Sequence, residues 1–341
     1  MISRLSRDAT SPRGAPDFTL RLFLAQTVAF CLGIRPALAY EMKPPKSIDG
    51  LRTSVPTPLL IRERDLAAGE GFTAYLVSYV SEGLKLYAMI SIPTGNRPQR
   101  GFPVVVANHG THSNPPRYGY SEDGRDLRPG DYYRSIPLLF STRGFIVVMP
   151  DYRGHNISAG AEYVGGRLSP AYYAEDVVAL LATLPQIENA DVCNVFMWGH
   201  SMGCEVSLRA LLASPAIRAA SLWSTIRIDI CKRAEYCEKR NSSRLVQRLR
   251  KESDALDQPL IANKIDLADL SAVLNIHHAV DDQSTLLGWS EELVAELSQV
   301  HKTYRFYTYS SDDHFFRSEF RDQAADRDVA LFRSVMFNGR G

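Results

Sequence analysis

The sequence has little excess charge of either sign, few cysteines and no apolar run long enough to cross a bilayer. Its 341 residues include 39 Lys and Arg against 38 Asp and Glu, a formal net charge of +1. Nucleic-acid-binding proteins usually carry a basic surplus, so this balance argues against nucleic acid as a partner. Five cysteines are too few for a disulfide-stabilised scaffold. The composition is that of a globular protein, and the chain is long enough to bury a full core.

The first 39 residues have the pattern of a secretory signal peptide. Residues 1–21 contain four arginines and two aspartates, and residues 22–34 form an uncharged, largely apolar stretch of 13 residues. The small-residue triplet 37–39 (Ala-Leu-Ala) then supplies a cleavage site. The apolar stretch is shorter than the roughly 20 residues that span a bilayer. We therefore expect cleavage after Ala39, export to the periplasm or the medium, and no stable membrane insertion afterwards; the alternative is a leader retained as an anchor.

Residues 40–341 are expected to form a single domain with one insertion. The composition shifts at 225–270, which is polar and partly basic, and we interpret this stretch as a small insertion or lid. Cys231 and Cys237 lie in it, six positions apart. Because export would place them in an oxidising compartment, they could form a local disulfide.

The middle of the chain alternates between strand and helix patterns. Two β-rich runs, 72–80 and 84–92, flank Ser81-Glu82-Gly83 and predict a hairpin. Short apolar runs such as 104–108 are typical of buried parallel strands. An antiparallel start followed by strand–helix alternation predicts an α/β fold, with a mostly parallel central sheet, an antiparallel N-terminal hairpin and helices on both faces. Further strands are expected at 145–150, 195–198, 220–224, 272–278 and 304–309, and helices from Ser169, at 207–213, at 289–300 and at about 316–337.

The segment Gly199-His200-Ser201-Met202-Gly203 matches the pattern G-x-S-x-G. It follows an expected strand and precedes an expected helix, which is the context that a nucleophile elbow requires. Glycine allows the sharp turn that projects the serine above the sheet. We interpret Ser201 as a nucleophile; the alternative is a serine that only caps the helix.

A serine nucleophile needs a base, and the base needs an orienting acid. In parallel sheets, ligand sites lie beyond the carboxyl ends of strands. Asp281 and Asp282 follow the expected strand 272–278, and His314 follows the strand 304–309. His301 precedes that last strand and belongs at the wrong end of the sheet. The residues therefore predict a Ser…Asp…His set in that chain order.

A metal site is a weaker alternative. His109, His112, Asp151 and His155 could gather near strand ends, but their spacing fits no familiar ligand set. A serine mechanism needs no metal, so we predict neither a metal nor a cofactor.

With these residues identified, the chain resembles α/β hydrolases of the prolyl-oligopeptidase (S9) and dienelactone-hydrolase-like type. The resemblance extends from about residue 84 to the C-terminus and implies the α/β-hydrolase fold. It is carried by Asn108-His109-Gly110, Asp151-Tyr152-Arg153-Gly154, Gly199–Gly203, His277-His278-Ala279-Val280-Asp281 and His314.

The resemblance also implies roles for individual residues. Members have H-G-x-x-D before the catalytic acid, which corresponds here to Asp281; because His278 replaces the glycine, Asp282 remains the alternative. Members usually have His-Gly-Gly in the oxyanion loop, where this chain has Thr111 in place of the second glycine. The resemblance thus implies that the N–H groups of Thr111 and Met202 bind the oxyanion.

The activity implied is that of an exported serine hydrolase that cleaves small carboxylic esters through an acyl-enzyme. The alternative is an S9-like serine peptidase acting on short peptides or amides. Gated oligopeptidases carry a β-propeller before the catalytic domain, and residues 40–71 are too few for blades of about 40 residues each. A non-catalytic binding protein with the same fold is the third possibility.

Overall fold

The computed structural model describes residues 43–53, 57–67, 69–111, 131–164, 168–226, 265–316 and 318–337. Apart from Lys43, these residues belong to one compact unit, Pro44–Gly341. The expected leader, most of the expected insertion at 225–270, and both Cys231 and Cys237 lie outside the described residues.

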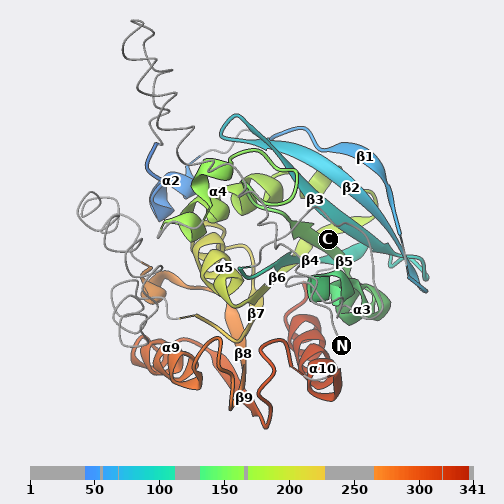
Figure 1. Ribbon diagram of the computed structural model, residues 1–341. Coiled ribbons are helices and arrows are strands. Elements are labelled where there is room, and N and C mark those ends of the chain that lie inside the picture. The colour runs from blue at the N-terminus through green and yellow to red at the C-terminus, as the bar shows by residue number, and fades with distance from the viewer. Residues whose placement is uncertain are drawn as a thin grey trace, which may run out of the picture. The chain divides into compact units, whose positions relative to one another are not determined.

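The described strands form one sheet in the order β1-β2-β3-β5-β4-β6-β7-β8-β9 (Figure 1). Pairs β1–β2, β2–β3 and β3–β5 are antiparallel, and all the other neighbours are parallel. The predicted mostly parallel sheet with an antiparallel N-terminal part is therefore confirmed. The strands are β1 (Ile61–Leu66), β2 (Phe72–Ser81), β3 (Leu84–Pro93), β4 (Phe102–Asn108), β5 (Ile146–Pro150), β6 (Ala190–His200), β7 (Ala219–Trp223), β8 (Val273–Ala279) and β9 (Tyr304–Tyr309).

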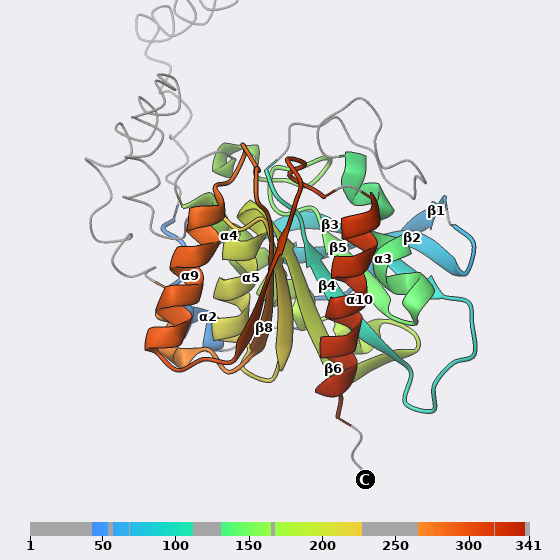
Figure 2. The ribbon, with the colours of Figure 1, turned by 90° about the horizontal axis from the view of Figure 1, so that it is seen from below.

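Helices cover both faces of the sheet, as Figure 2 shows. The alternation of side chains along a strand explains why both faces are apolar. On β4, Val104 and Val106 pack into one core with α4, α5 and α9, while Val105 and Ala107 pack into a second core with α3 and α10. The helices are α2 (Ile48–Arg52), α3 (Ile136–Phe140), α4 (Ser169–Leu181), α5 (Met202–Ala213), α9 (Leu287–Gln299) and α10 (Ser318–Ser334).

The edge strand β1 was not expected from the sequence. Its residues, Ile-Arg-Glu-Arg-Asp-Leu, are charged and mostly exposed, so they lack the apolar alternation that marks a half-buried strand. The Arg62 guanidinium lies 4.3 Å from the ring centre of Tyr75 on β2. The register also shifts between Arg62 and Arg64. Charged side chains and bulges of this kind are common on edge strands, where they oppose pairing with another chain.

A buried carboxylate ties α10 to the centre of the sheet. Asp328 on α10 is fully buried and accepts a hydrogen bond from Trp223 Nε1 on β7, at 2.9 Å. It contacts Asn275 Nδ2 and His277 Nε2 on β8 at the same distance. His277 therefore has a structural partner of its own, although it lies in the segment that resembles the family's acid motif.

Among the described helices, none combines the length and the apolar character that crossing a bilayer requires.

Candidate active site

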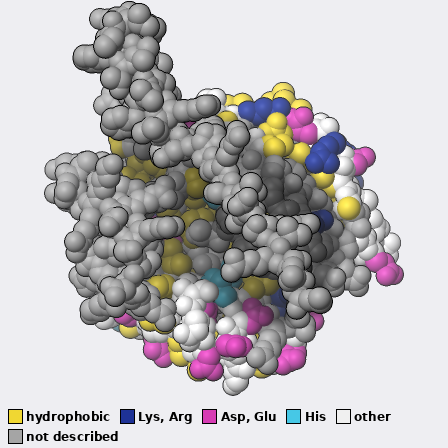
Figure 3. All heavy atoms as spheres, viewed as in Figure 1, with side chains coloured by type: hydrophobic (Ala, Val, Ile, Leu, Met, Phe, Trp, Pro, Cys, Tyr) yellow, Lys and Arg dark blue, Asp and Glu magenta, His cyan; other side chains and the backbone are white. Residues whose placement is uncertain are grey.

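The loops after β6, β8 and β9 gather the predicted site residues at one edge of the sheet. Ser201 directly follows β6, Asp282 lies shortly after β8, and His314 lies in the loop after β9. Figure 2 shows the loops that follow β8 and β9 together at the top of the sheet. Figure 3 looks onto this edge, where histidine and hydrophobic side chains are visible at the surface. The structure thus places these residues beyond the carboxyl ends of parallel strands, where ligand sites of such sheets lie.

Ser201 occupies a strained turn between β6 and α5. Its φ of 56° and ψ of −121° lie outside the usual regions for a residue with a side chain. The glycines at either side explain why the turn can form. A Cβ at Gly199 would lie 2.6 Å from the Gly203 carbonyl oxygen, and one at Gly203 would collide with the backbone of Asn108. The G-x-S-x-G spacing therefore fits a geometric need, with Ser201 N–H donating to the Trp223 carbonyl at 2.9 Å.

The acid beside His314 is Asp282, so the assignment of that position to Asp281 was wrong. Asp282 Oδ2 lies 2.7 Å from His314 Nδ1, and Asp281 is exposed. The cause is the length of the strand ladder after β8. Val280 N–H still bonds to the Tyr309 carbonyl and Asp281 N–H to the Ser311 carbonyl, so the chain turns one residue later than the family pattern implies.

His278 explains why the pattern H-G-x-x-D does not locate the aspartate that contacts His314. Its ring, in place of the usual glycine, is fully buried. It lies 2.6 Å from Ser290 Oγ and 3.1 Å from the Thr285 carbonyl. A large side chain therefore holds the turn at a point where the family has none.

Asp282 accepts hydrogen bonds from its own turn, and these favour its ionised form. Its Oδ1 accepts hydrogen bonds from the N–H groups of Ser284 and Thr285, at 2.7 and 3.1 Å. Its Oδ2 accepts one from Thr285 Oγ1 at 2.9 Å. Burial raises the pKa of Asp282, but the hydrogen bond to His314, the charge of that ring and the backbone donors outweigh burial, so the pKa is lowered. The group is therefore ionised at neutral pH and can orient an imidazole.

His314 is held through both its ring and its backbone. Its side chain is 22% exposed, enough to meet a substrate from solvent. Its carbonyl accepts from Ser224 Oγ at 3.0 Å and lies 2.9 Å from His200 Nε2. Since Asp282 holds Nδ1, Nε2 is the nitrogen left for proton transfer. Within the described part of the chain no hydrogen bond joins Ser201 to His314; such bonds are often long until substrate binds.

The two predicted oxyanion residues come together beside Ser201. Gly110 packs so closely that a Cβ there would lie 2.8 Å from Ser201 Cβ. Its N–H donates to the Tyr133 hydroxyl at 2.6 Å, so the next N–H along the loop is that of Thr111. Thr111 Oγ1 lies 3.3 Å from Met202 Sδ. Met202 is the first residue of α5, where N–H groups have no acceptor within the helix and the helix dipole favours negative charge.

The histidines near this edge have protein partners. His109 Nδ1 lies 2.8 Å from the Gly110 carbonyl, and Nε2 lies 3.1 Å from the Asp151 carbonyl. No cluster of three His, Cys, Asp or Glu side chains suited to a metal ion occurs among the described residues. His112 lies outside them. His301 follows α9 and precedes β9, at the opposite edge of the sheet from His314.

The turn after β5 contacts the loop that carries His109 and Gly110. Arg153 is buried and donates to Asp176 and Glu175 on α4, at 2.7 and 2.9 Å. Its neighbour Tyr152 donates its hydroxyl to the His109 carbonyl at 3.1 Å. These contacts fix the His109 loop to α4 through buried polar groups.

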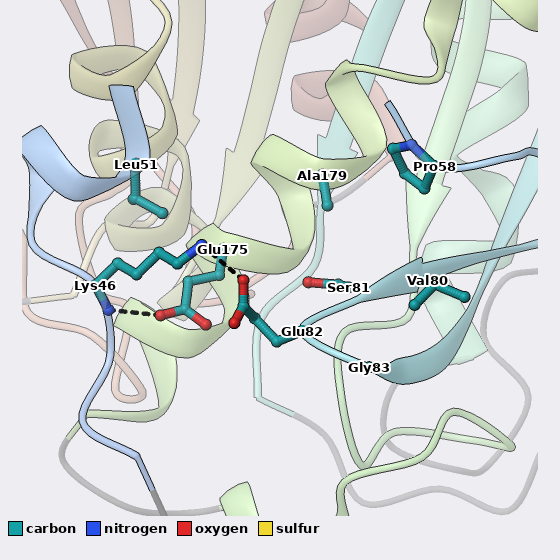
Figure 4. Close-up of a pocket in the computed structure, with 9 residues that line it drawn as sticks. All are labelled: Lys46, Leu51, Pro58, Val80, Ser81, Glu82, Gly83, Glu175 and Ala179. Atoms are coloured by element: carbon teal, nitrogen blue, oxygen red, sulfur yellow. Dashed lines mark hydrogen bonds and ion pairs between the residues drawn. The ribbon is translucent and has the colours of Figure 1, made fainter. Parts of the chain in front are cut away.

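A separate cavity is lined by Glu175, one of the two carboxylates that Arg153 contacts. Glu175 Oε1 accepts from the Lys46 N–H at 2.6 Å, and Lys46 Nζ pairs with Glu82 at the β2–β3 turn (Figure 4). The cavity that these residues line includes none of the predicted catalytic residues. It is a separate feature from the site around Ser201.

The sequence and structure comparisons fit this architecture. Residues 131–264 match a family model described as "Serine aminopeptidase, S33". A Bacillus subtilis (strain 168) protein described as "Uncharacterized peptidase YtmA" is 22% identical over 248 residues, which cover 71% of this chain and 86% of that protein.

Among solved structures, acetyl xylan esterase 1 from Thermoanaerobacterium sp. is similar with a TM-score of 0.61 and 15% identity, covering 85% of this chain and 95% of that one. Dipeptidyl peptidase 4 of Porphyromonas gingivalis is similar with a TM-score of 0.56 and 19% identity, covering 77% of this chain and 35% of that one. The strand order and these neighbours show that the chain has the α/β-hydrolase fold.

Proposed function

We propose that this protein is an exported serine hydrolase that cleaves small carboxylic esters, with Ser201, His314 and Asp282 as its catalytic triad. The observation that carries the proposal is the joint presence, at one edge of the sheet, of a serine on a strained elbow and a buried Asp–His pair. Neither feature is needed by the fold alone. A non-catalytic protein with this fold would not require both features.

The geometry supports a two-step acyl transfer. Ser201 Oγ attacks the ester carbonyl carbon while His314 Nε2 takes the hydroxyl proton, and Asp282 stabilises the imidazolium that forms. The carbonyl oxygen becomes an oxyanion that the N–H groups of Thr111 and Met202 would bind. When the bond to the alcohol breaks, His314 returns the proton to the leaving oxygen. A water activated by His314 then hydrolyses the acyl-enzyme, which releases the acid and restores Ser201.

Ester hydrolysis is favoured over peptide hydrolysis by the extent of the structural match. The acetyl xylan esterase corresponds to this chain over 95% of its own length, whereas dipeptidyl peptidase 4 corresponds over 35%. The second candidate, a serine peptidase acting on short peptides or amides, rests on the matched aminopeptidase family and on the Bacillus subtilis relative.

A matched pair of chromogenic substrates separates the two activities. We expect the protein 40–341 to hydrolyse p-nitrophenyl acetate with a kcat/KM at least about 100-fold above that for p-nitroacetanilide, because p-nitrophenolate is the better leaving group and no peptide site is proposed. Initial rates at 405 nm, corrected for the Ser201→Ala background, measure both. Comparable values for the two substrates would establish the peptidase instead.

Export is the second part of the proposal and rests on the pattern of residues 1–39. Expression of the full chain in a bacterium with a secretory pathway should yield a mature protein that begins at Tyr40. N-terminal sequencing of the protein from the periplasmic and medium fractions measures this. A product in the cytoplasm that retains residues 1–39 would contradict it.

A further inference from the structure

A buried hydrogen-bond chain connects the oxyanion loop to the backbone of His314. Gly110 N–H lies 2.6 Å from the Tyr133 hydroxyl, and that hydroxyl lies 2.6 Å from His200 Nδ1. His200 Nε2 lies 2.9 Å from the His314 carbonyl. These hydrogen bonds thus link Gly110, which packs against Ser201, to His314 through the residue that immediately precedes the nucleophile.

The direction of each hydrogen bond follows from its partners. A carbonyl only accepts, so His200 Nε2 must carry the proton that is donated to the His314 carbonyl. Burial lowers the pKa of His200 well below its usual value, so the ring is neutral and its Nδ1 is an acceptor. Tyr133 must then donate its proton to His200 and accept the N–H of Gly110. Within these three hydrogen bonds each donor faces one acceptor, and none of the three can be reversed while the ring is neutral.

The rings of Tyr133 and His200 are also held in place by packing. Tyr133 is 4% exposed and His200 is fully buried. The Tyr133 ring contacts that of Phe315, with centroids 5.7 Å apart. The His200 and His314 rings lie with their centroids 4.5 Å apart. Movement of Tyr133 would therefore be transmitted to both loops that carry the proposed chemistry.

We propose that Tyr133 and His200 are positioning residues, which hold the Thr111 N–H and the His314 imidazole in place on either side of Ser201. The inference rests on the proposed ester hydrolysis and deepens it. Because the Tyr133 hydroxyl occupies the Gly110 N–H, the oxyanion donor on this loop is the next N–H, that of Thr111. Neither positioning residue touches the substrate; each acts through the backbone of a residue that does.

The test is Tyr133→Phe, which removes one hydroxyl and keeps the packed ring. We expect kcat for p-nitrophenyl acetate to fall about 10- to 100-fold while KM changes less than about threefold, because misplaced groups cost transition-state binding more than substrate binding. Tyr79→Phe is the matched control: Tyr79 is buried, and in the described structure its hydroxyl has no hydrogen-bond partner. That variant should keep wild-type kcat.

A second variant tests the same hydrogen-bond chain independently, in case Tyr133→Phe does not fold. His200→Gln keeps an amide N–H that can reach the His314 carbonyl but has no acceptor at the position of Nδ1, which faces Tyr133, so it should lower kcat by a similar factor. The double variant Tyr133→Phe/His200→Gln should then be no slower than the worse single variant, because both break one chain.

Two results would overturn the proposal. One is a folded Tyr133→Phe or His200→Gln protein with kcat within twofold of Tyr79→Phe. The other is losses that multiply in the double variant. Serine-dependent turnover by the wild type, measured in the same assay, separates these failures from a failure of the proposed function itself.

Discussion

Replacement of Ser201 by alanine should reduce kcat/KM for p-nitrophenyl acetate by about 10⁴-fold or more and abolish covalent labelling by a fluorophosphonate probe. The reason is chemical: alanine removes the only atom that can form the acyl-enzyme, and the residual rate comes from binding and the oxyanion donors alone. Labelling is read on a gel, and the rate from initial velocities. The fold should survive, because the strained turn depends on Gly199 and Gly203, and alanine keeps the serine's Cβ.

Ser298→Ala is the matched control for this variant. Ser298 is an exposed serine on α9, far along the chain from the elbow. Its replacement makes the same chemical change without touching the site, so labelling and turnover should equal those of the wild type. If Ser201→Ala protein with a wild-type thermal unfolding midpoint still labels at the wild-type rate, another residue is the nucleophile.

The central strands were predictable because they are buried on both faces. Continuous apolar runs such as 104–108 have no other stable place than a sheet covered by helices, and the structure places β4 there. β1 was not predicted because it is exposed. Its charged side chains are those of a solvent-exposed edge, and it is a strand only because β2 offers hydrogen-bond partners. Tertiary context of that kind cannot be detected in a local pattern.

The candidate site was predictable where local geometry dictates the residues. The elbow around Ser201 needs glycines at fixed positions, so the sequence carries its signature. The contact of His200 with Tyr133 could not be predicted, because it joins residues 67 positions apart and leaves no local pattern. Sequence spacing also could not settle which aspartate faces His314. That choice depends on how far the β8–β9 ladder extends, which is a property of the paired strands.

The pair of neighbouring aspartates offers the sharpest test of the site. Asp282→Asn should lower kcat/KM by about 10³- to 10⁴-fold, whereas Asp281→Asn should change it less than about threefold. Both variants remove one negative charge at adjacent positions, so any general electrostatic effect is common to both. The difference arises because an amide in place of the Asp282 carboxylate would offer an N–H to His314 Nδ1 or lose the contact. Either result disfavours the tautomer whose Nε2 can accept the serine proton.

Asparagine is the informative replacement because its side-chain oxygen can still accept the N–H groups of Ser284 and Thr285. The turn should therefore remain, and thermal unfolding midpoints for both variants verify that it does. Initial rates on p-nitrophenyl acetate at about pH 7.5, where the Asp282 carboxylate of the wild type is ionised, give the comparison. Equal losses, or a greater loss for Asp281→Asn, would return the acid's role to Asp281. That outcome would mean that the loop after β8 turns one residue earlier, where the family pattern puts it.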